Sequence, residues 1–251
     1  MLQLDMTGQK APPPAGLLEG ATLLLDFDGT MVELAPRPDA VLVDDRLRRL
    51  VTALGDRLDR RIAFISGRDA ATLKALLGLD GIAIAGSHGL EILHASGKVD
   101  RPVRPASLDT AVKRMRAFAD AHPGVLVEDK PLGAALHYRL APQDEAASNR
   151  LAQQLAADTG LALQTGKKMV ELRLGSGDKG MAVERLMADP GMVGTIPVFA
   201  GDDDTDEPGF LAARRLDGHG VLVGPERQSA ARFRLPGVDA VRDWLESELA
   251  R

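Results

Sequence analysis

The chain has 251 residues and a mass of 26.7 kDa, which is enough for one large domain or two modest ones. It contains no cysteine, which excludes disulfide frameworks, thiolate zinc sites, iron–sulfur clusters and a cysteine nucleophile. A net charge of -5 and an aromatic content of 3% disfavour a nucleic-acid partner. No apolar run reaches the ~18 residues of a membrane span, and residues 1–16 lack the pattern of a secretory signal, so we expect a cytoplasmic protein without a membrane partner.

The first part of the chain alternates short apolar runs with amphipathic segments. Residues 1–20 are polar and rich in proline, and we expect them to form an extended lead-in. The apolar runs lack polar alternation, which favours strands that are buried on both faces of a sheet. Strands are expected at 21–25, 62–65 and 82–85, and helices at 44–58 and 69–77, the second capped by Asp69. This order predicts a parallel sheet with helices on both faces.

The pattern then changes to two helix–strand–strand units. Helices are expected at 107–121 and 143–157, and strands at 125–128, 134–140, 161–164 and 169–174. We interpret residues 105–175 as an inserted α+β cap domain. The alternating pattern resumes with a helix at 179–187, strands at 197–200 and 220–223, and a helix at 238–249. The predicted fold is therefore α/β, with a Rossmann-like core formed by residues 21–104 and 176–251.

Two acidic segments directly follow predicted core strands. In an open α/β sheet, ligands bind beyond the carboxyl ends of the strands. Asp26 and Asp28 could there coordinate a cation, attack an electrophile and transfer a proton, although a strand-ending turn also explains them. Residues 201–207 hold five acidic side chains, among them Asp202 and Asp206, which would repel one another unless a cation or solvent balanced them. Two such loops at one sheet edge predict an all-oxygen site suited to Mg²⁺.

Two further residues are candidates for holding a phosphate. Ser66 closes a predicted strand and offers a hydroxyl, while Lys179 opens a helix and adds an ammonium group to its N-terminus. A helix-entry turn for Ser66 and a solvated lysine in the first helical turn are the alternatives. His88 lies in a glycine-rich loop and His137 in an apolar strand. For both, an imidazole whose hydrogen bonds are satisfied in the core or at the surface is at least as good an interpretation as a role in the site.

Residues 175–180 match the dinucleotide-binding pattern G-x-G-x-x-G between a predicted strand and a helix. A nicotinamide-dependent oxidoreductase is therefore an alternative function. Asp178 argues against it, because that carboxylate would lie where a pyrophosphate must bind. The alternative would also leave Asp26, Asp28 and Ser66 without a role.

Four motifs occur in a recognisable order: DFDGT at 26–30, SGR at 66–68, DKG at 178–180 and GDDDTDE at 201–207. Together they resemble the haloacid dehalogenase superfamily of aspartate-nucleophile phosphatases. The segments GSHGLE at 86–91, ALHYR at 135–139 and GKKMVE at 166–171 resemble the trehalose-6-phosphate phosphatase family within it. The resemblance covers residues 21–250, almost the whole chain.

The resemblance implies roles for individual residues. Asp26 would be the nucleophile and a Mg²⁺ ligand, and Asp28 the general acid and base, with its backbone carbonyl on the metal. Asp202 would be the third protein ligand with Asp206 in support, and Ser66 and Lys179 would hold the phosphate. Sugar contacts are implied for Lys130, Arg139, Lys167 and Glu171 in the cap, and Arg68, His88 and Glu91 would face the substrate from the core.

The expected function is Mg²⁺-dependent hydrolysis of trehalose 6-phosphate through an aspartyl-phosphate, a step of trehalose biosynthesis. A phosphatase or phosphomutase for another sugar phosphate on the same fold, or a non-catalytic sugar-phosphate sensor, remains an alternative. We expect a small-molecule partner only, and a monomer or weak dimer.

Overall fold

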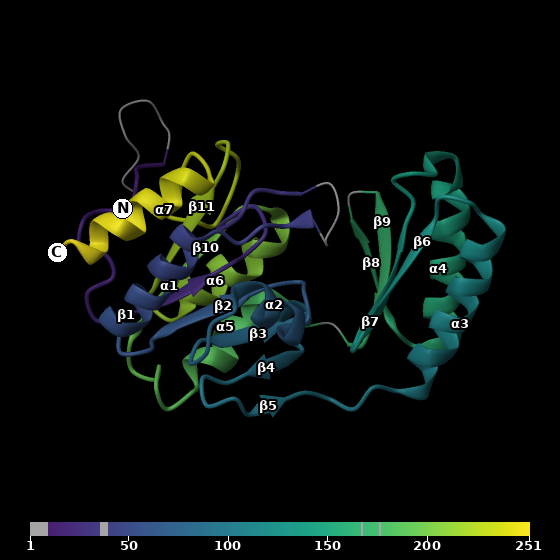
Figure 1. Ribbon diagram of the computed structural model, residues 1–251, viewed down its shortest axis with the longest axis horizontal. Coiled ribbons are helices and arrows are strands. Elements are labelled where there is room, and N and C mark those ends of the chain that lie inside the picture. Colours follow the sequence, from purple (N-terminus) through teal and green to yellow (C-terminus); the bar gives the residue numbers. More distant parts are fainter. Residues whose placement is uncertain (1–9, 36–39, 167, 176) are drawn as a thin grey trace. The chain divides into compact units, whose positions relative to one another are not determined.

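The computed structural model describes residues 10–35, 40–166, 168–175 and 177–251 (Figure 1). The chain divides into two compact units, and each is treated separately below. The core unit contains Met1–Asp100 and Asp178–Arg251, and the cap unit contains Arg101–Gly177. Among the described residues, no helix combines the length and the apolar character that crossing a bilayer requires.

The core unit is built on one eight-stranded sheet with the order β12-β11-β10-β1-β2-β3-β4-β5. Neighbouring strands from β12 to β3 are parallel, which confirms the expected α/β class. The strands at the other edge, β4 and β5, are antiparallel and were outside the prediction, because runs of three and two residues carry no usable periodicity. In chain order the strands are β1 (Ala21–Leu25), β2 (Ile62–Ile65), β3 (Ala83–Gly86), β4 (Glu91–Leu93), β5 (Val99–Asp100), β10 (Ile196–Gly201), β11 (His219–Val223) and β12 (Phe233–Leu235).

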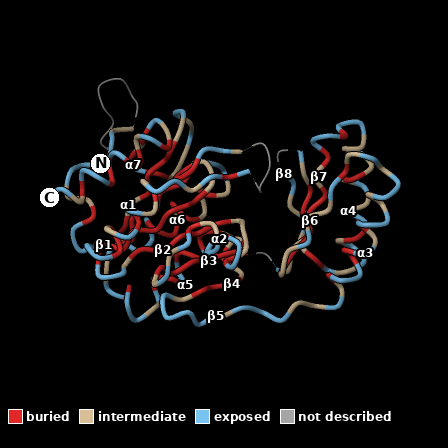
Figure 2. The backbone as a smooth tube through the Cα atoms, viewed as in Figure 1, coloured by how far each residue is buried: buried red, intermediate tan, exposed pale blue. Residues whose placement is uncertain are grey.

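Helices cover both faces of this sheet, as the alternation of elements predicts. Leu23 and Leu25 of β1 belong to one apolar cluster, whereas Leu24 belongs to the other, as successive side chains of a strand must. Figure 2 shows buried backbone concentrated along the core strands. One face packs against α1 (Asp45–Arg57), α2 (Ala70–Leu77) and α7 (Val238–Leu249), and the other against α5 (Lys179–Met187) and α6 (Glu207–Arg215).

Helix α6 is absent from the sequence prediction. Its first turn contains Pro208 and Gly209, which usually indicate a turn. Proline is tolerated in a first helical turn because its missing N–H has no partner there. A Cβ on Gly209 would lie 2.3 Å from the Phe199 ring, so the glycine lets α6 approach β10 closely.

The cap unit has the expected two helix–strand–strand units, α3 (Ala106–Ala121), β6 (Leu126–Lys130), β7 (Gly133–His137), α4 (Glu145–Thr159), β8 (Ala162–Gly166) and β9 (Met169–Arg173). Its strands form an antiparallel sheet with the order β6-β7-β9-β8. Leu136 and Leu172 pack with both helices in one apolar cluster. The alternating residues, including Lys130, His137 and Glu171, therefore lie on the opposite face of the sheet.

Candidate active site

Three neighbouring strands end at one edge of the core sheet, and each is followed by a predicted site residue. β1 pairs in parallel with β10 on one side and with β2 on the other. Asp26 follows β1, Ser66 follows β2, and Asp202 follows β10. Hydrogen-bonded strands lie ~4.8 Å apart, so this topology brings residues that are far apart in the sequence into one region.

Three carboxylates gather at this edge. One oxygen atom from each of Asp26, Asp202 and Asp206 lies within 4.8 Å of the other two. The two acidic loops also touch at Gly29, which has a φ of +86°; a Cβ there would lie 2.2 Å from Asp202 Oδ2. Only glycine accepts both this backbone conformation and this approach. The DFDGT turn and the acidic loop therefore meet around Asp202.

Lys179 is the cation of this cluster. It begins α5 directly after Asp178, whose carboxylate caps the helix by accepting a hydrogen bond from Met181 N. The Lys179 ammonium donates hydrogen bonds of 2.7 Å to Asp26 Oδ1 and to Asp206 Oδ1. Burial alone would lower the pKa of Lys179, but the two adjacent carboxylates hold it above its ordinary value, so the side chain stays charged.

The electrostatics of the cluster favour a bound divalent cation. Burial raises the pKa of Asp26 to about 7 despite the opposing effect of Lys179. Burial and the neighbouring Asp206 raise the pKa of Asp202 to about 7, and burial together with Asp26 does the same for the pKa of Asp206. Within this group, one ammonium against three ionised carboxylates leaves two negative charges. A hard divalent cation with oxygen ligands balances them, so the donor set fits such a metal.

The three carboxylates are not equivalent. Asp206 is fully buried, and its Oδ1 accepts from Lys179 while its Oδ2 accepts from the backbone N–H groups of Asp202 and Asp203, at 2.9 and 3.0 Å. Asp26 also accepts from the Thr30 hydroxyl at 3.2 Å. Asp206 thus orders the loop and holds Lys179.

Asp28 lies two residues beyond Asp26 and forms an ion pair with Arg68. Arg68 Nε donates to Asp28 Oδ2 at 2.7 Å, and Arg68 Nη2 donates to Asp28 Oδ1 at 2.8 Å. This two-point contact fixes the orientation of the carboxylate. The structure therefore joins the SGR and DFDGT motifs through their side chains, a link that strand order alone does not specify.

The loop after β3 is held against the SGR motif. Ser87 and His88 both adopt left-handed backbone conformations, with φ of 51° and 57°. Their N–H groups donate to the carbonyls of Arg68 and Ser66, at 2.8 and 3.0 Å. A Cβ on Gly67 would lie 2.7 Å from His88 Cε1, so the imidazole rests directly on this glycine. The unusual backbone thus places His88 beside Ser66.

Glu91 supports this loop from below. It is 1% exposed in β4, and its Oε1 accepts hydrogen bonds from Ala70 N at 2.9 Å and from the Ser87 hydroxyl at 3.1 Å. The carboxylate therefore joins the N-terminus of α2 to the turn that carries His88. The sequence analysis placed Glu91 at the substrate. No pattern in the sequence indicates that its carboxylate instead accepts hydrogen bonds from Ala70 and Ser87.

In the cap unit, the face of the sheet opposite the helices brings two of the predicted sugar-contacting residues together. Lys130 Nζ lies 3.1 Å from Glu171 Oε1 and 3.8 Å from Glu128 Oε2. His137 Nε2 lies 2.8 Å from the same Glu128 oxygen. Sequence reasoning missed Glu128, although strand alternation from Lys130 assigns it to this face. Arg139 is exposed in the turn after β7, and Lys167 lies outside the described residues.

Comparison with known proteins agrees with this geometry. The sequence model of the trehalose-phosphatase family matches residues 24–239. The chain belongs to the trehalose-phosphatase family. Within the family, it is similar to the trehalose-6-phosphate phosphatase of Escherichia coli (strain K12), with 38% identity over 224 residues that cover 88% of this chain and 84% of that protein.

Solved structures share the fold of this trehalose-phosphatase family member. A crystal structure of a trehalose-6-phosphate phosphatase related protein has a TM-score of 0.79 and 25% identity, and the match covers 91% of this chain and 96% of that chain. A haloacid dehalogenase-like hydrolase from Bacteroides thetaiotaomicron has a TM-score of 0.67 and 16% identity, with 90% and 98% of the two chains covered. The second likeness concerns the fold alone.

Family membership leaves the dinucleotide-binding alternative without support. The Asp178 carboxylate caps the α5 N-terminus, the place that the pattern would reserve for a pyrophosphate. The ammonium group of the following Lys179 bonds to Asp26 and Asp206. The G-x-G-x-x-G match is therefore incidental.

Proposed function

We propose that this chain hydrolyses trehalose 6-phosphate to trehalose and phosphate with the help of Mg²⁺. The observation that carries the proposal is the group formed by Asp26, Asp202, Asp206 and Lys179 at the ends of β1 and β10. The trehalose-phosphatase family model and the name of the E. coli relative support the choice of substrate.

The reaction has two steps, both centred on Asp26. A carboxylate oxygen of Asp26 attacks phosphorus, the bond from phosphorus to the sugar oxygen breaks, and protonated Asp28 gives its proton to that oxygen. Water then attacks the phosphorus of the aspartyl-phosphate and loses a proton to Asp28, and the bond to Asp26 breaks. Trehalose and phosphate are released, and Asp26 and Asp28 return to their starting forms.

The surrounding residues bind and orient the phosphate. Mg²⁺ would be held by the carboxylates of Asp26 and Asp202 and by the backbone carbonyl of Asp28, and it would supply positive charge for the phosphoryl oxygens. Lys179 adds a second positive charge, and the Ser66 hydroxyl donates a hydrogen bond. Arg68 contacts both oxygens of the Asp28 carboxylate, which is the ionised form that takes a proton from water in the second step; protonated Asp28 must release one of these two contacts before it acts as the acid. These groups lower the barrier by stabilising charge where it develops.

Recognition of the sugar belongs to the cap unit in this proposal. Glu128, Lys130 and Glu171 present charged hydrogen-bonding groups on one face of its sheet, and Arg139 and Lys167 add two cations. Charged groups of both signs suit a ligand with many hydroxyls, each of which both donates and accepts. His88 is assigned to the substrate on the core side, with Glu91 holding its loop. We further propose a monomer or weak dimer without a nucleic-acid partner.

The test is phosphate release from a panel of sugar phosphates, with Mg²⁺ and after its removal by a chelator. We expect trehalose 6-phosphate to rank first and activity to return when Mg²⁺ is restored. Asp26→Asn should abolish turnover, whereas Asp45→Asn, which removes an acidic residue from the first turn of α1, should not. Normal phosphate release by Asp26→Asn would refute the nucleophile, and a higher rank for common hexose phosphates would refute the substrate.

A further inference from the structure

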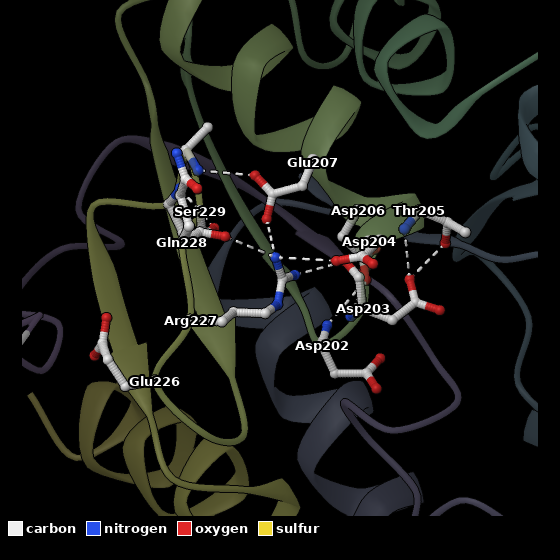
Figure 3. A network of polar contacts seen from close by, with 12 residues as sticks. Asp202, Asp203, Asp204, Thr205, Asp206, Glu207, Glu226, Arg227, Gln228 and Ser229 are labelled. Carbon is white, nitrogen blue, oxygen red and sulfur yellow. Dashed lines mark hydrogen bonds and ion pairs between the residues drawn. The ribbon is translucent and has the colours of Figure 1, made fainter.

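The acidic loop, residues 201–207, carries an excess of negative charge. It holds five acidic side chains in seven residues, and Lys179 contacts only Asp206 among them. A second cation, Arg227, lies beside the loop in the segment that joins β11 to β12 (Figure 3). The function proposed above assigns no role to this arginine.

Arg227 contacts the acidic loop at several points. Its Nη2 donates a 2.7 Å hydrogen bond to the backbone carbonyl of Asp203. Its Nη1 bonds to Glu207 Oε1 and lies 3.4 Å from Asp204 Oδ1. The other Glu207 oxygen accepts from Ala230 N at 2.8 Å, so Glu207 fastens both segments together. The planar guanidinium therefore joins a main-chain carbonyl to a carboxylate in a fixed geometry.

The same stretch of backbone is held from its other side by Asp206. The N–H groups of Asp202 and Asp203 both donate to Asp206 Oδ2. The carbonyl of Asp203 is held by Arg227, so the Asp202–Asp203 backbone is fixed on its N–H side and on its C=O side. In Figure 3 the Asp202 carboxylate points away from Arg227 and Glu207. The direction of the Asp202 side chain is thus a consequence of a backbone held at both ends.

We propose that Arg227 is a positioning residue for the metal site, which sets the affinity for the divalent cation by fixing the backbone that presents Asp202. The inference rests on the metal site of the proposed function. Arg227 touches neither Asp26 nor Lys179 in any contact that the described residues show; it acts through Asp203 and Glu207. Partners that orient metal ligands commonly change metal affinity by 10- to 100-fold when they are removed.

The direction in which the Mg²⁺ affinity changes when Arg227 is removed separates a positioning role from a simple effect of its charge. If Arg227 acted only through its positive charge, its removal would make the site more negative and tighten the binding of a cation. If it acts by holding the loop, its removal lets like charges push the loop apart, and binding weakens. Lysine keeps the charge but cannot bridge a carbonyl and a carboxylate with a planar fork.

The experiment measures Mg²⁺ binding to the full chain by isothermal titration calorimetry. We expect Arg227→Gln to raise the dissociation constant by about 10-fold or more, and Arg227→Lys to recover less than half of this change on a logarithmic scale. The matched control is Arg215→Gln, which removes the same charge from an exposed ion pair with Glu184 in the same unit, and which should bind like the parent. At saturating Mg²⁺, Arg227→Gln should regain the parent's turnover.

Folding of each variant is checked by urea unfolding, followed through Trp244, the single tryptophan of the chain. Should Arg227→Gln fail to fold, Arg227→Lys takes its place: it keeps the charge and loses the planar fork, so Mg²⁺ binding weaker than that of the parent supports positioning, and binding equal to that of the parent overturns it. Binding to folded Arg227→Gln that equals or exceeds that of the parent, or full recovery by Arg227→Lys, would overturn the inference. Absence of Mg²⁺ binding by the parent itself would instead overturn the metal site of the proposed function.

Discussion

Replacing Gly29 with alanine provides the sharpest test of how the two acidic loops meet. Gly29 lies in the turn after Asp28 with a φ of +86°, and an added Cβ would lie 2.2, 2.4 and 2.7 Å from three atoms of the Asp202 carboxylate. Cβ contacts below 3.0 Å essentially do not occur, so the nearest oxygen must move by at least about 0.8 Å, the difference between 3.0 and 2.2 Å. Asp202 is therefore displaced even if the backbone does not move.

Two effects of the substitution can be separated by their magnitudes. The left-handed backbone alone costs an alanine about 1 kcal/mol of folding stability. Gly20 has a similar φ of +69°, and an added Cβ there would meet nothing within 4 Å, so Gly20→Ala carries the conformational cost without the clash. Misplacing a reacting group or ligand by about 1 Å costs roughly 100-fold in rate. The rate of phosphate release should therefore fall by this factor in Gly29→Ala and should not fall in Gly20→Ala.

The assays are calorimetric Mg²⁺ titration, phosphate release under steady-state conditions and urea unfolding followed by Trp244 fluorescence. Both variants should show a comparable loss of unfolding free energy, whereas only Gly29→Ala should bind Mg²⁺ at least about tenfold more weakly. Mg²⁺ affinity and turnover in Gly29→Ala within twofold of those in Gly20→Ala would show that Asp202 does not need its position, and the reasoning would fail.

Three further predictions follow from contacts in the two units. Lys179→Met should lower the unfolding free energy by about 3–5 kcal/mol in the absence of metal, because Asp26 and Asp206 lose their buried cation; a loss below 1 kcal/mol in urea melts would contradict this. Asp44 caps α1 through Leu47 N and contacts Arg242, and both contacts lower its pKa below the ordinary value of 3.8. The contribution of ionised Asp44 to folding stability is therefore present above pH 3.8 and is lost as the pH falls through the lowered pKa. Asp44→Ala should lower the unfolding free energy by about 1 kcal/mol at neutral pH and by progressively less at acid pH. A difference in unfolding free energy between parent and variant that stays constant across the pH series would contradict this prediction. Glu171→Gln should raise the KM for trehalose 6-phosphate by about tenfold, because one charge-assisted hydrogen bond is lost, and it should leave the hydrolysis of p-nitrophenyl phosphate unchanged. The control is Glu145→Gln, which changes the exposed ion pair with Lys168. Equal losses of activity on both substrates would count against a role of Glu171 in sugar recognition.

The parts of the site that follow strand ends could be predicted from the sequence. Asp26 comes directly after the apolar run 21–25, and Asp202 follows the run 197–200 after one glycine; parallel strands end at one edge whatever their separation along the chain. Asp69 as the cap of α2 follows from equally local chemistry, and the structure confirms it through the hydrogen bond from Thr72 N. Local rules of this kind depend on a few consecutive residues, so a single sequence is sufficient to predict these features.

Residues that act through partners far away in the chain could not be found in this way. Glu91 accepts from Ala70 N, 21 residues earlier, and Arg68 pairs with Asp28, 40 residues earlier. Neither partner is specified by the periodicity or the motif that contains the residue. Even the short strand β4, on which Glu91 lies, is too brief to predict. These contacts depend on the lengths of the connecting segments and on the twist of the sheet, which the alternation of apolar residues does not encode.

Arg227 shows why charge is nevertheless a useful guide to such residues. Five acidic side chains in seven residues must be balanced somewhere, and the sequence therefore indicates that cations will approach the acidic loop without indicating which ones. Among the described residues, Lys179 contacts Asp206 of this loop, and Arg227 contacts Asp204, Glu207 and the Asp203 carbonyl. Lys179 also contacts Asp26, the proposed nucleophile, whereas Arg227 contacts the backbone of the loop. If both proposals hold, removing Lys179 should weaken the hold on the phosphate, and removing Arg227 should disturb the geometry of the metal ligand Asp202.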